Sequence, residues 1–221
     1  MLGTSGVTGL QTSSRQYQST GGIGSIIVTF KPGGLAAFTP YPIAEFQDAN
    51  IDLDCIFPKQ SVRDMEYRLQ EAASAAERVQ VVQSFLLSQH KQKSQSELIA
   101  EAAERIQLRR GDVSVERLAG ELFVSKRTLE RRFNAEIGIT PKKFAGIVRF
   151  QRAIQLKHAG LSYLDLIESC NFSDHSHFAH DFKAFAGCTP EQFFGESLQP
   201  ELAEQFNERK ADSPVTHTMY Q

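Results

Sequence analysis

The chain has 221 residues and a formal net charge of −2, and its 41% hydrophobic and 23% charged residues are an ordinary globular balance. It contains no apolar run of about 18 residues, and its Gly/Ser/Thr-rich start lacks a basic segment, so the sequence predicts neither a membrane span nor a signal peptide. The three cysteines are far apart and form no CxxC pattern, which argues against a disulfide framework or zinc finger and indicates a cytoplasmic protein.

The N-terminal quarter is predicted to be a tail followed by β-structure. Residues 1–22 are small and polar without periodicity, which is typical of a flexible tail. Within the β-rich part at 23–57, IIVTF at 26–30 predicts a strand, LAAF at 35–38 is another short apolar run, and IDLDCIF at 51–57 alternates like a half-buried strand.

Residues 61–88 are predicted to be helical. Ser74 and Glu77 have the spacing of a capping box, so two helices joined at Ser74 are an alternative to one long helix. Apolar residues near a/d spacing form a stripe: Val62, Met65, Leu69, Ala72, Ala76, Val79 and Leu86. Such a stripe more often indicates core packing, and the alternative is a homodimer seam through residues 61–88.

The polar segment HKQKSQS at 90–96 has the composition of a linker. We therefore divide the chain into a flexible tail, a partial β-rich and helical regulatory or dimerisation region, a linker, a helical domain and a flexible C-terminal tail. The ranges are 1–22, 23–90, 91–96, 97–195 and 196–221, respectively.

The domain at 97–195 is predicted to contain seven helices separated by Ser, Thr, Gly and Pro signals. Gly111, Gly138, Gly160 and Gly187 mark helix ends. The expected helices are about 97–110, 115–122, 126–137, 141–159, 163–170, 174–186 and a short one after Thr189-Pro190. The fold class is thus mainly α, with a small β-rich part before the helical domain.

Two segments of this domain repeat each other. The corner GITP at 138–141 recurs as GCTP at 187–190, an offset of 49, whereas the preceding short helices match at an offset of 48. The matched apolar pairs are Leu118 with Leu166, Ala119 with Ile167, Leu122 with Cys170, Leu129 with Phe178, and Phe133 with Phe182. A short helix, a tight turn and a longer helix are the plan of a helix-turn-helix, whose second helix enters the major groove of DNA.

The candidate DNA-binding residues lie off the apolar face of each longer helix. Arg can donate two hydrogen bonds to guanine, and Glu can accept one from cytosine. The first copy contributes Lys126, Arg127, Glu130 and Arg131, and the second contributes His175, Ser176, Ala179 and His180. Lys142, Lys143 and Arg149 are expected near phosphates or in structural roles.

The charge distribution agrees with this interpretation. Residues 105–157 contain thirteen Lys/Arg and five Asp/Glu, a local net charge of +8, although the whole chain is slightly acidic. A basic block of this kind favours contact with phosphates, and the alternative is a solvated helical surface. Residues 161–195 have a local net charge of −4.

The segments SVERLAGELFVSKRTLERRF and SYLDLIESCNFSDHSHFAHDFKAFAGCTPEQF, with the GITP corner, resemble the tandem helix-turn-helix domain of the AraC/XylS family. The resemblance covers about 97–195, and Arg149 and Ala153 match its linker helix. It implies a sequence-specific transcription regulator that binds double-stranded DNA, with two recognition helices in successive major grooves and residues 141–159 as a rigid spacer.

Several residues depart from the family pattern. Phe123 and Asn171 stand at the tight turns where Gly is frequent, Ile167 replaces a small Ala, and His180 replaces an Arg. These differences indicate a strong first unit and a weaker or more selective second one. Residues 23–88 also resemble a cupin-like sensor region of one branch of the family, but about 35 residues are too few for a barrel. Either that region is truncated or residues 1–22 hold another strand. The sequence therefore leaves open whether the protein binds a small-molecule effector.

Other chemistries have little support in the sequence. His175, His177 and His180 are metal-type ligands, but no fourth ligand follows at a suitable spacing, so we expect no metal site and no cofactor. No nucleophile elbow, phosphate loop or HExxH motif is present, so we do not expect an enzyme. The alternative function is a protein-interaction module that docks on another regulator or on RNA polymerase.

Overall fold

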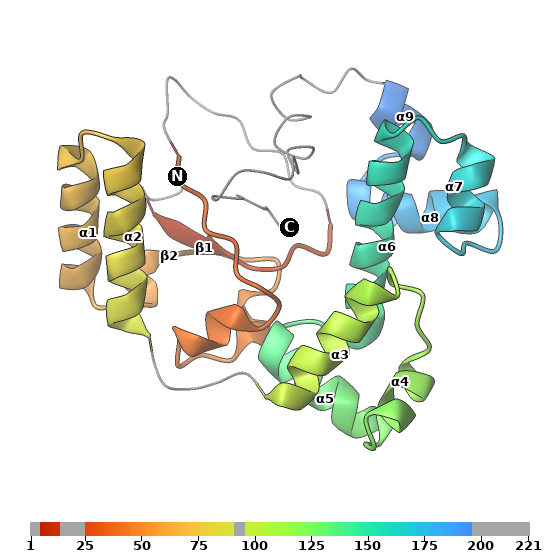
Figure 1. Ribbon diagram of the computed structural model, residues 1–221, viewed down its shortest axis with the longest axis horizontal. Coiled ribbons are helices and arrows are strands. Elements are labelled where there is room, and N and C mark those ends of the chain that lie inside the picture. The colour runs from red at the N-terminus through yellow and green to blue at the C-terminus, as the bar shows by residue number, and fades with distance from the viewer. Residues whose placement is uncertain (1–4, 14–24, 91–95, 196–221) are drawn as a thin grey trace.

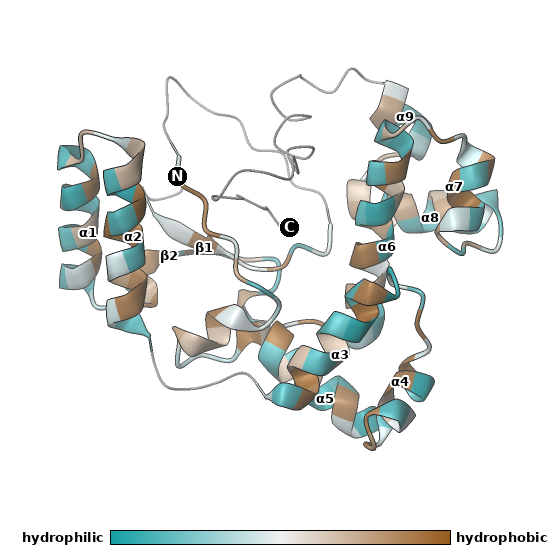
Figure 2. Ribbon diagram, viewed as in Figure 1, coloured by the Kyte–Doolittle hydropathy of each residue, from teal (hydrophilic) through white to brown (hydrophobic). Residues whose placement is uncertain are grey.

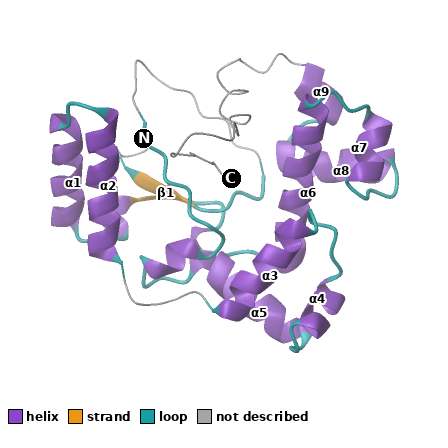
Figure 3. Ribbon diagram, in the orientation of Figure 1, coloured by secondary structure: helices purple, strands orange, loops and turns teal. Residues whose placement is uncertain are grey.

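The computed structural model describes residues 5–13, 25–90 and 96–195, and the predicted linker at 91–95 and tail at 196–221 lie outside them (Figure 1). Helices dominate the described part, with one small sheet near the N-terminus (Figure 3). Within that part, no helix is long and apolar enough to cross a membrane.

The sheet consists of two short antiparallel strands, β1 (Gly6–Thr8) and β2 (Asn50–Asp52), with Val7 opposite Ile51. The prediction of a flexible tail is therefore wrong for residues 5–13, and the alternative of a strand hidden within 1–22 is confirmed. Beyond β1, the backbone N–H of Thr12 donates to the Asp48 carboxylate at 2.6 Å, which fixes the end of this segment.

The predicted strand at 26–30 is also wrong. Ile26, Ile27 and Val28 are 37–45% exposed and lie outside any strand. LAAF lies mostly in a 3₁₀ helix, η1 (Gly34–Ala37), and the half-buried strand expected at 51–57 is shortened to β2 and continues as η3 (Leu53–Cys55). β-branched residues favour strands only where a partner edge is available, and local sequence does not reveal that edge.

Residues 59–89 form a hairpin of two helices, α1 (Lys59–Glu71) and α2 (Ala75–Gln89). Ser74 caps α2 by accepting the N–H of Glu77, so the two-helix alternative is confirmed. Val62 and Met65 are buried against Val81 and Phe85 inside the hairpin. This part of the apolar stripe is core of one chain and is not available as a dimer seam.

The seven helices expected at 97–195 are all present, and the described residues between 112 and 185 contain no strand. They are α3 (Glu97–Leu108), α4 (Val115–Glu121), α5 (Lys126–Ile137), α6 (Pro141–His158), α7 (Tyr163–Ser169), α8 (His175–Ala186) and α9 (Pro190–Gly195). α3 ends two residues earlier than predicted, because Arg110 adopts φ 55° before Gly111. A Ser, Thr or Asp side chain caps the start of each helix from α3 to α8 by accepting an N–H three residues later.

The two repeated segments form two units, each with its own core. The first unit is α4 with α5, and the second is α7 with α8. Leu118, Leu129 and Phe133 are completely buried in a core shared with α3 and α6. Leu166 and Phe178 are completely buried in the second core, under the other end of α6. Figure 2 shows hydrophobic stretches along α3, α5 and α6 where these helices meet.

The long helix α6 joins the two units (Figure 1). The turn after α3 packs so closely on it that a Cβ at Gly111 would lie 2.3 Å from the Ala145 carbonyl oxygen. The side-chain amide of Asn171, in the second unit, also donates to the Asp112 carboxylate, in the turn between α3 and α4, at 2.8 Å. These contacts fix the first unit, α6 and the second unit as one arrangement.

The N-terminal region also touches the first unit. The 3₁₀ helix η2 (Ile43–Phe46) packs on α5. Ile43 and Phe46 are buried, and a Cβ at Gly138, just after α5, would lie 3.0 Å from the Ile43 carbonyl oxygen. The N-terminal region of the chain therefore covers the C-terminal end of α5.

Gly111 and Gly160 offer a matched test of the packing on α6. Both have φ near 80–90°, but nothing lies within 4 Å of a Cβ at Gly160. We expect Gly160→Ala to lower the free energy of unfolding by about 1 kcal/mol through backbone strain alone. Gly111→Ala adds overpacking and should cost about 2–4 kcal/mol. Urea denaturation measures both, and equal costs would show that the turn does not depend on its contact with α6.

Candidate nucleic-acid interface

Each unit turns between its helices through a left-handed residue. Phe123 has φ 56° and Asn171 has φ 58°. In the first unit the N–H of Val124 donates to the Ala119 carbonyl at 3.0 Å, and in the second the N–H of Phe172 donates to the Ile167 carbonyl at 3.0 Å. This is the hydrogen-bond pattern of a Schellman C-cap, so the two turns have one geometry despite their different residues.

The outward face of α5 presents two arginines one turn apart. Arg127 and Arg131 are exposed, whereas Leu129 and Phe133 on the inward face are completely buried. Within the described residues, neither arginine forms an ion pair. Their guanidinium groups are therefore free to donate to an external acceptor.

Lys126 and Glu130 lie on the same outward side but are already engaged. The Lys126 ammonium contacts the Glu116 carboxylate of α4 and lies 4.0 Å from Glu130. The hydrogen bond from Lys126 lowers the pKa of Glu116, and the same contact raises the pKa of Lys126. A DNA contact by Lys126 would have to compete with Glu116.

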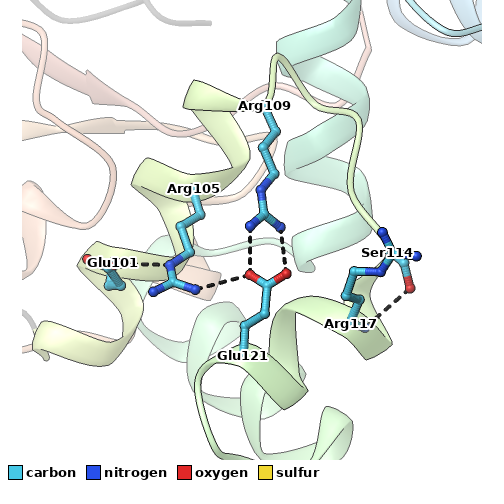
Figure 4. Close-up of polar contacts among 6 residues, drawn as sticks. All are labelled: Glu101, Arg105, Arg109, Ser114, Arg117 and Glu121. Atoms are coloured by element: carbon cyan, nitrogen blue, oxygen red, sulfur yellow. Dashed lines mark hydrogen bonds and ion pairs between the residues drawn. The ribbon is translucent and has the colours of Figure 1, made fainter.

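Two other arginines of the basic block are used inside the domain. Arg109 donates to Glu121 at 2.7 and 3.1 Å, and Arg105 donates to Glu121 at 3.0 Å and to Glu101 at 2.7 Å (Figure 4). The hydrogen bonds from Arg109 and Arg105 lower the pKa of Glu121, which remains charged at neutral pH. This network ties α3 to α4, so its arginines are not free cations.

The three basic candidates on α6 differ in their surroundings. Lys142 is exposed. The Lys143 ammonium lies 4.6 Å from the centre of the Phe185 ring. Arg149 is half-buried, lies 3.3 Å from the Asp181 carboxylate and stacks over Phe172. Arg149 thus connects α6 to the second unit. This contact fits the structural role that the sequence analysis gave as the alternative to a phosphate contact.

The outward face of α8 is less basic than that of α5. His175, Ser176 and His180 are exposed, whereas Ala179 is only half-exposed. His175 lies 3.4 Å from Glu191 and His180 lies 3.6 Å from Asp181. The Asp174 carboxylate caps α8 by accepting the N–H of His177 at 2.8 Å, and this bond lowers the pKa of Asp174.

No group of His, Cys, Asp and Glu side chains that could hold a metal ion is found in the part of the chain that the structure describes. A gap between α6 and α8, lined by side chains such as Phe150, Phe178 and Phe182, has no room for a ligand. Burial raises the pKa of the Cys170 thiol, which is typical of a structural cysteine.

Of the candidates expected on the outward faces of α5 and α8, six are exposed, whereas Glu130 and Ala179 are half-buried; the six are Lys126, Arg127, Arg131, His175, Ser176 and His180. The sequence missed the intramolecular partners, namely Glu116 for Lys126, Asp181 for Arg149 and Glu191 for His175. No local signal could have found the last two, because the partners are 32 and 16 residues apart in the chain.

A family described as a helix-turn-helix domain matches residues 118–196, and a domain of unknown function (DUF6597) matches residues 2–52. Curated relatives include the HTH-type transcriptional activator RhaS of Escherichia coli O139:H28 strain E24377A, O9:H4 strain HS and K12 strain DH10B. Each is 32% identical over 73 residues, or 33% of this chain. The match spans 26% of each relative's length.

No solved structure matches the chain. The matched range nevertheless begins within α4 and extends to the end of α9, so it includes most of the first unit, α6 and the second unit. The RhaS similarity and the repeated Gly-x-Thr-Pro corners point the same way. The helical C-terminal domain of this chain is thus a helix-turn-helix domain that resembles those of the AraC/XylS family of regulators.

Proposed function

We propose that the chain is a sequence-specific DNA-binding transcription regulator. The observation that carries this proposal is the pair Arg127 and Arg131, which are exposed, one helical turn apart and without an intramolecular ion pair among the described residues. A fixed pair of guanidinium groups on the outer face of a helix suits the guanine edges of a major groove.

The first unit supplies most of the binding energy in this proposal. Its recognition helix α5 carries Arg127 and Arg131, and the exposed Lys142 in the first turn of α6 is proposed to contact phosphate. The second unit reads bases through His175, Ser176 and His180, which are weaker groups for this purpose. Arg149 positions the second unit through Asp181 and does not contact DNA.

The similarity to transcriptional activators supports a role in the regulation of transcription. We propose that the protein acts in the bacterial cytoplasm and that RNA polymerase is a further partner. The competing function is a protein-interaction module with weak DNA binding. The two differ in salt dependence, because neutralising phosphates releases counterions. Full-length protein bound to random duplex DNA should lose affinity steeply between about 50 and 200 mM salt if the first function is correct.

The first prediction concerns base contact by Arg131. Selection from a random duplex pool with the full chain provides the cognate sequence. On that sequence, Arg131→Ala should cost about 1–3 kcal/mol of binding free energy and relax the preference at one base pair, because a bidentate contact to guanine is lost. Fluorescence anisotropy on cognate and random duplexes measures both effects.

Arg132→Ala is the matched control, because Arg132 is the next residue of α5 but lies 3.6 Å from Glu136. It removes the same charge and should leave the base preference unchanged. If Arg131→Ala weakens binding to cognate and random DNA equally, Arg131 contacts phosphate only and the assignment to a base is wrong.

The second prediction concerns the rigid spacing of the two units. If both units read bases, the selected sequence contains two submotifs with centres about 10 base pairs apart, one helical turn of DNA. Inserting about 5 base pairs between them moves the second submotif to the opposite face of the duplex, so affinity should fall about tenfold or more. An affinity that is insensitive to the insertion would mean that α5 binds alone.

A further inference from the structure

Phe123 is exposed in a way that neither packing nor backbone geometry explains. Its side chain is 97% exposed, the highest value among the large hydrophobic residues of the described ranges. Its φ of 56° lies in the left-handed region, where a Cβ crowds the following carbonyl and where Gly or Asn is normally preferred. The second unit has Asn171 at this position, so the Phe ring does not stabilise the turn as such.

Phe123 lies close to the N-terminus of α5. Only Val124 separates it from Ser125, which caps α5. Since consecutive Cα atoms are about 3.8 Å apart, the Cα of Phe123 lies within about 8 Å of that of Ser125. Val124 is half-buried in the first core, whereas Phe123 is exposed and precedes the exposed Lys126 and Arg127 by three and four residues.

An aromatic ring at a basic helix start suits a partner that is both anionic and apolar at close range. Duplex DNA has both properties, because the edge of its major groove carries phosphates, deoxyribose C–H groups and thymine methyl groups. If α5 enters the groove, the turn before it reaches this edge. The free arginines of α5 make DNA a better match than a protein surface.

We propose that Phe123 is a DNA-contacting residue that packs on the apolar edge of the major groove and contributes to sequence preference. This inference rests on the proposed function. It also explains why an unfavourable residue occupies the turn, because its cost in the free protein is offset in the complex.

The test compares stability with affinity, which should change in opposite directions. Phe123→Gly and Phe123→Asn remove the ring and suit the left-handed backbone, so we expect the melting temperature of the full chain to rise by about 2 °C. Affinity for the duplex selected with wild-type protein should fall about five- to tenfold, because an apolar contact is lost. Phe123→Tyr keeps the ring and should bind within about twofold of wild type.

Leu108→Ala is the control for loss of an exposed apolar side chain, because Leu108 is 74% exposed and is the last residue of α3, outside both helix-turn-helix units. It should leave the affinity unchanged. Replacing each thymine of the selected duplex by uracil then identifies the contacted group. A loss at one position with wild type but not with Phe123→Gly indicates a methyl group, and no loss at any position would show that Phe123 contacts no thymine methyl and would contradict its contribution to sequence preference.

Three results would overturn the inference. Equal affinity of wild type and Phe123→Gly for the selected duplex excludes a DNA contact, and a concurrent loss of reporter transcription would assign Phe123 to a protein partner. Lower melting temperatures of both Gly and Asn variants would show that the ring stabilises the turn. If wild-type protein selects no sequence at all, the proposed function fails and the role of Phe123 fails with it.

Discussion

The complete burial of one face of α5 is the constraint on which the proposed interface depends. Leu129 and Phe133 are inaccessible to solvent in a core shared with α3, α4 and α6. Because a helix repeats every 3.6 residues, fixing these two side chains inward forces Arg127 and Arg131 outward. The same arrangement recurs in α8, where Phe178 and Phe182 take the inward positions. The chemistry of each outward face is then free to differ without disturbing the core.

The second level of organisation is the relation between the units. α6 contacts the first core at one end and the second core at the other, and polar contacts reinforce this connection. Arg149 of α6 reaches Asp181 of the second unit, and Asn171 of the second unit reaches Asp112 in the turn between α3 and α4. A half-buried Arg–Asp pair contributes orientation more than net stability, because its desolvation offsets much of the attraction. We therefore regard Asp181 as a positioning residue.

Charge pairing separates the basic residues of the helical domain into two groups. Arg105, Arg109 and Arg149 hold helices together, whereas Arg127 and Arg131 have no partner of this kind in the described part of the chain. The net charge of the segment thus overstates its positive surface. The N-terminal region adds one further contact, since η2 packs on the C-terminal end of α5 and leaves its N-terminal end exposed.

The sequence by itself determined the helical domain, because its signals are local. Ser114, Ser125 and Thr140 cap helices through hydrogen bonds three residues away, and the apolar repeat identified which face of each longer helix is buried. The outward position of Arg127 and Arg131 follows from that periodicity. The left-handed turn at Phe123, by contrast, is suggested only by the resemblance, because the family often has Gly where this chain has Phe.

Only the tertiary structure decided the strands and the charge partners, because both depend on residues distant in the chain. IIVTF at 26–30 has strong β-propensity but lies outside any strand, whereas the polar GVT at 6–8 pairs with residues 50–52. Likewise, Asp181 is matched to Arg149 by the packing of α8 on α6, across 32 residues of sequence. Strand pairing and ion pairing require contact between two segments that are distant in the chain. Local sequence specifies the conformation of each segment but not which segments come into contact.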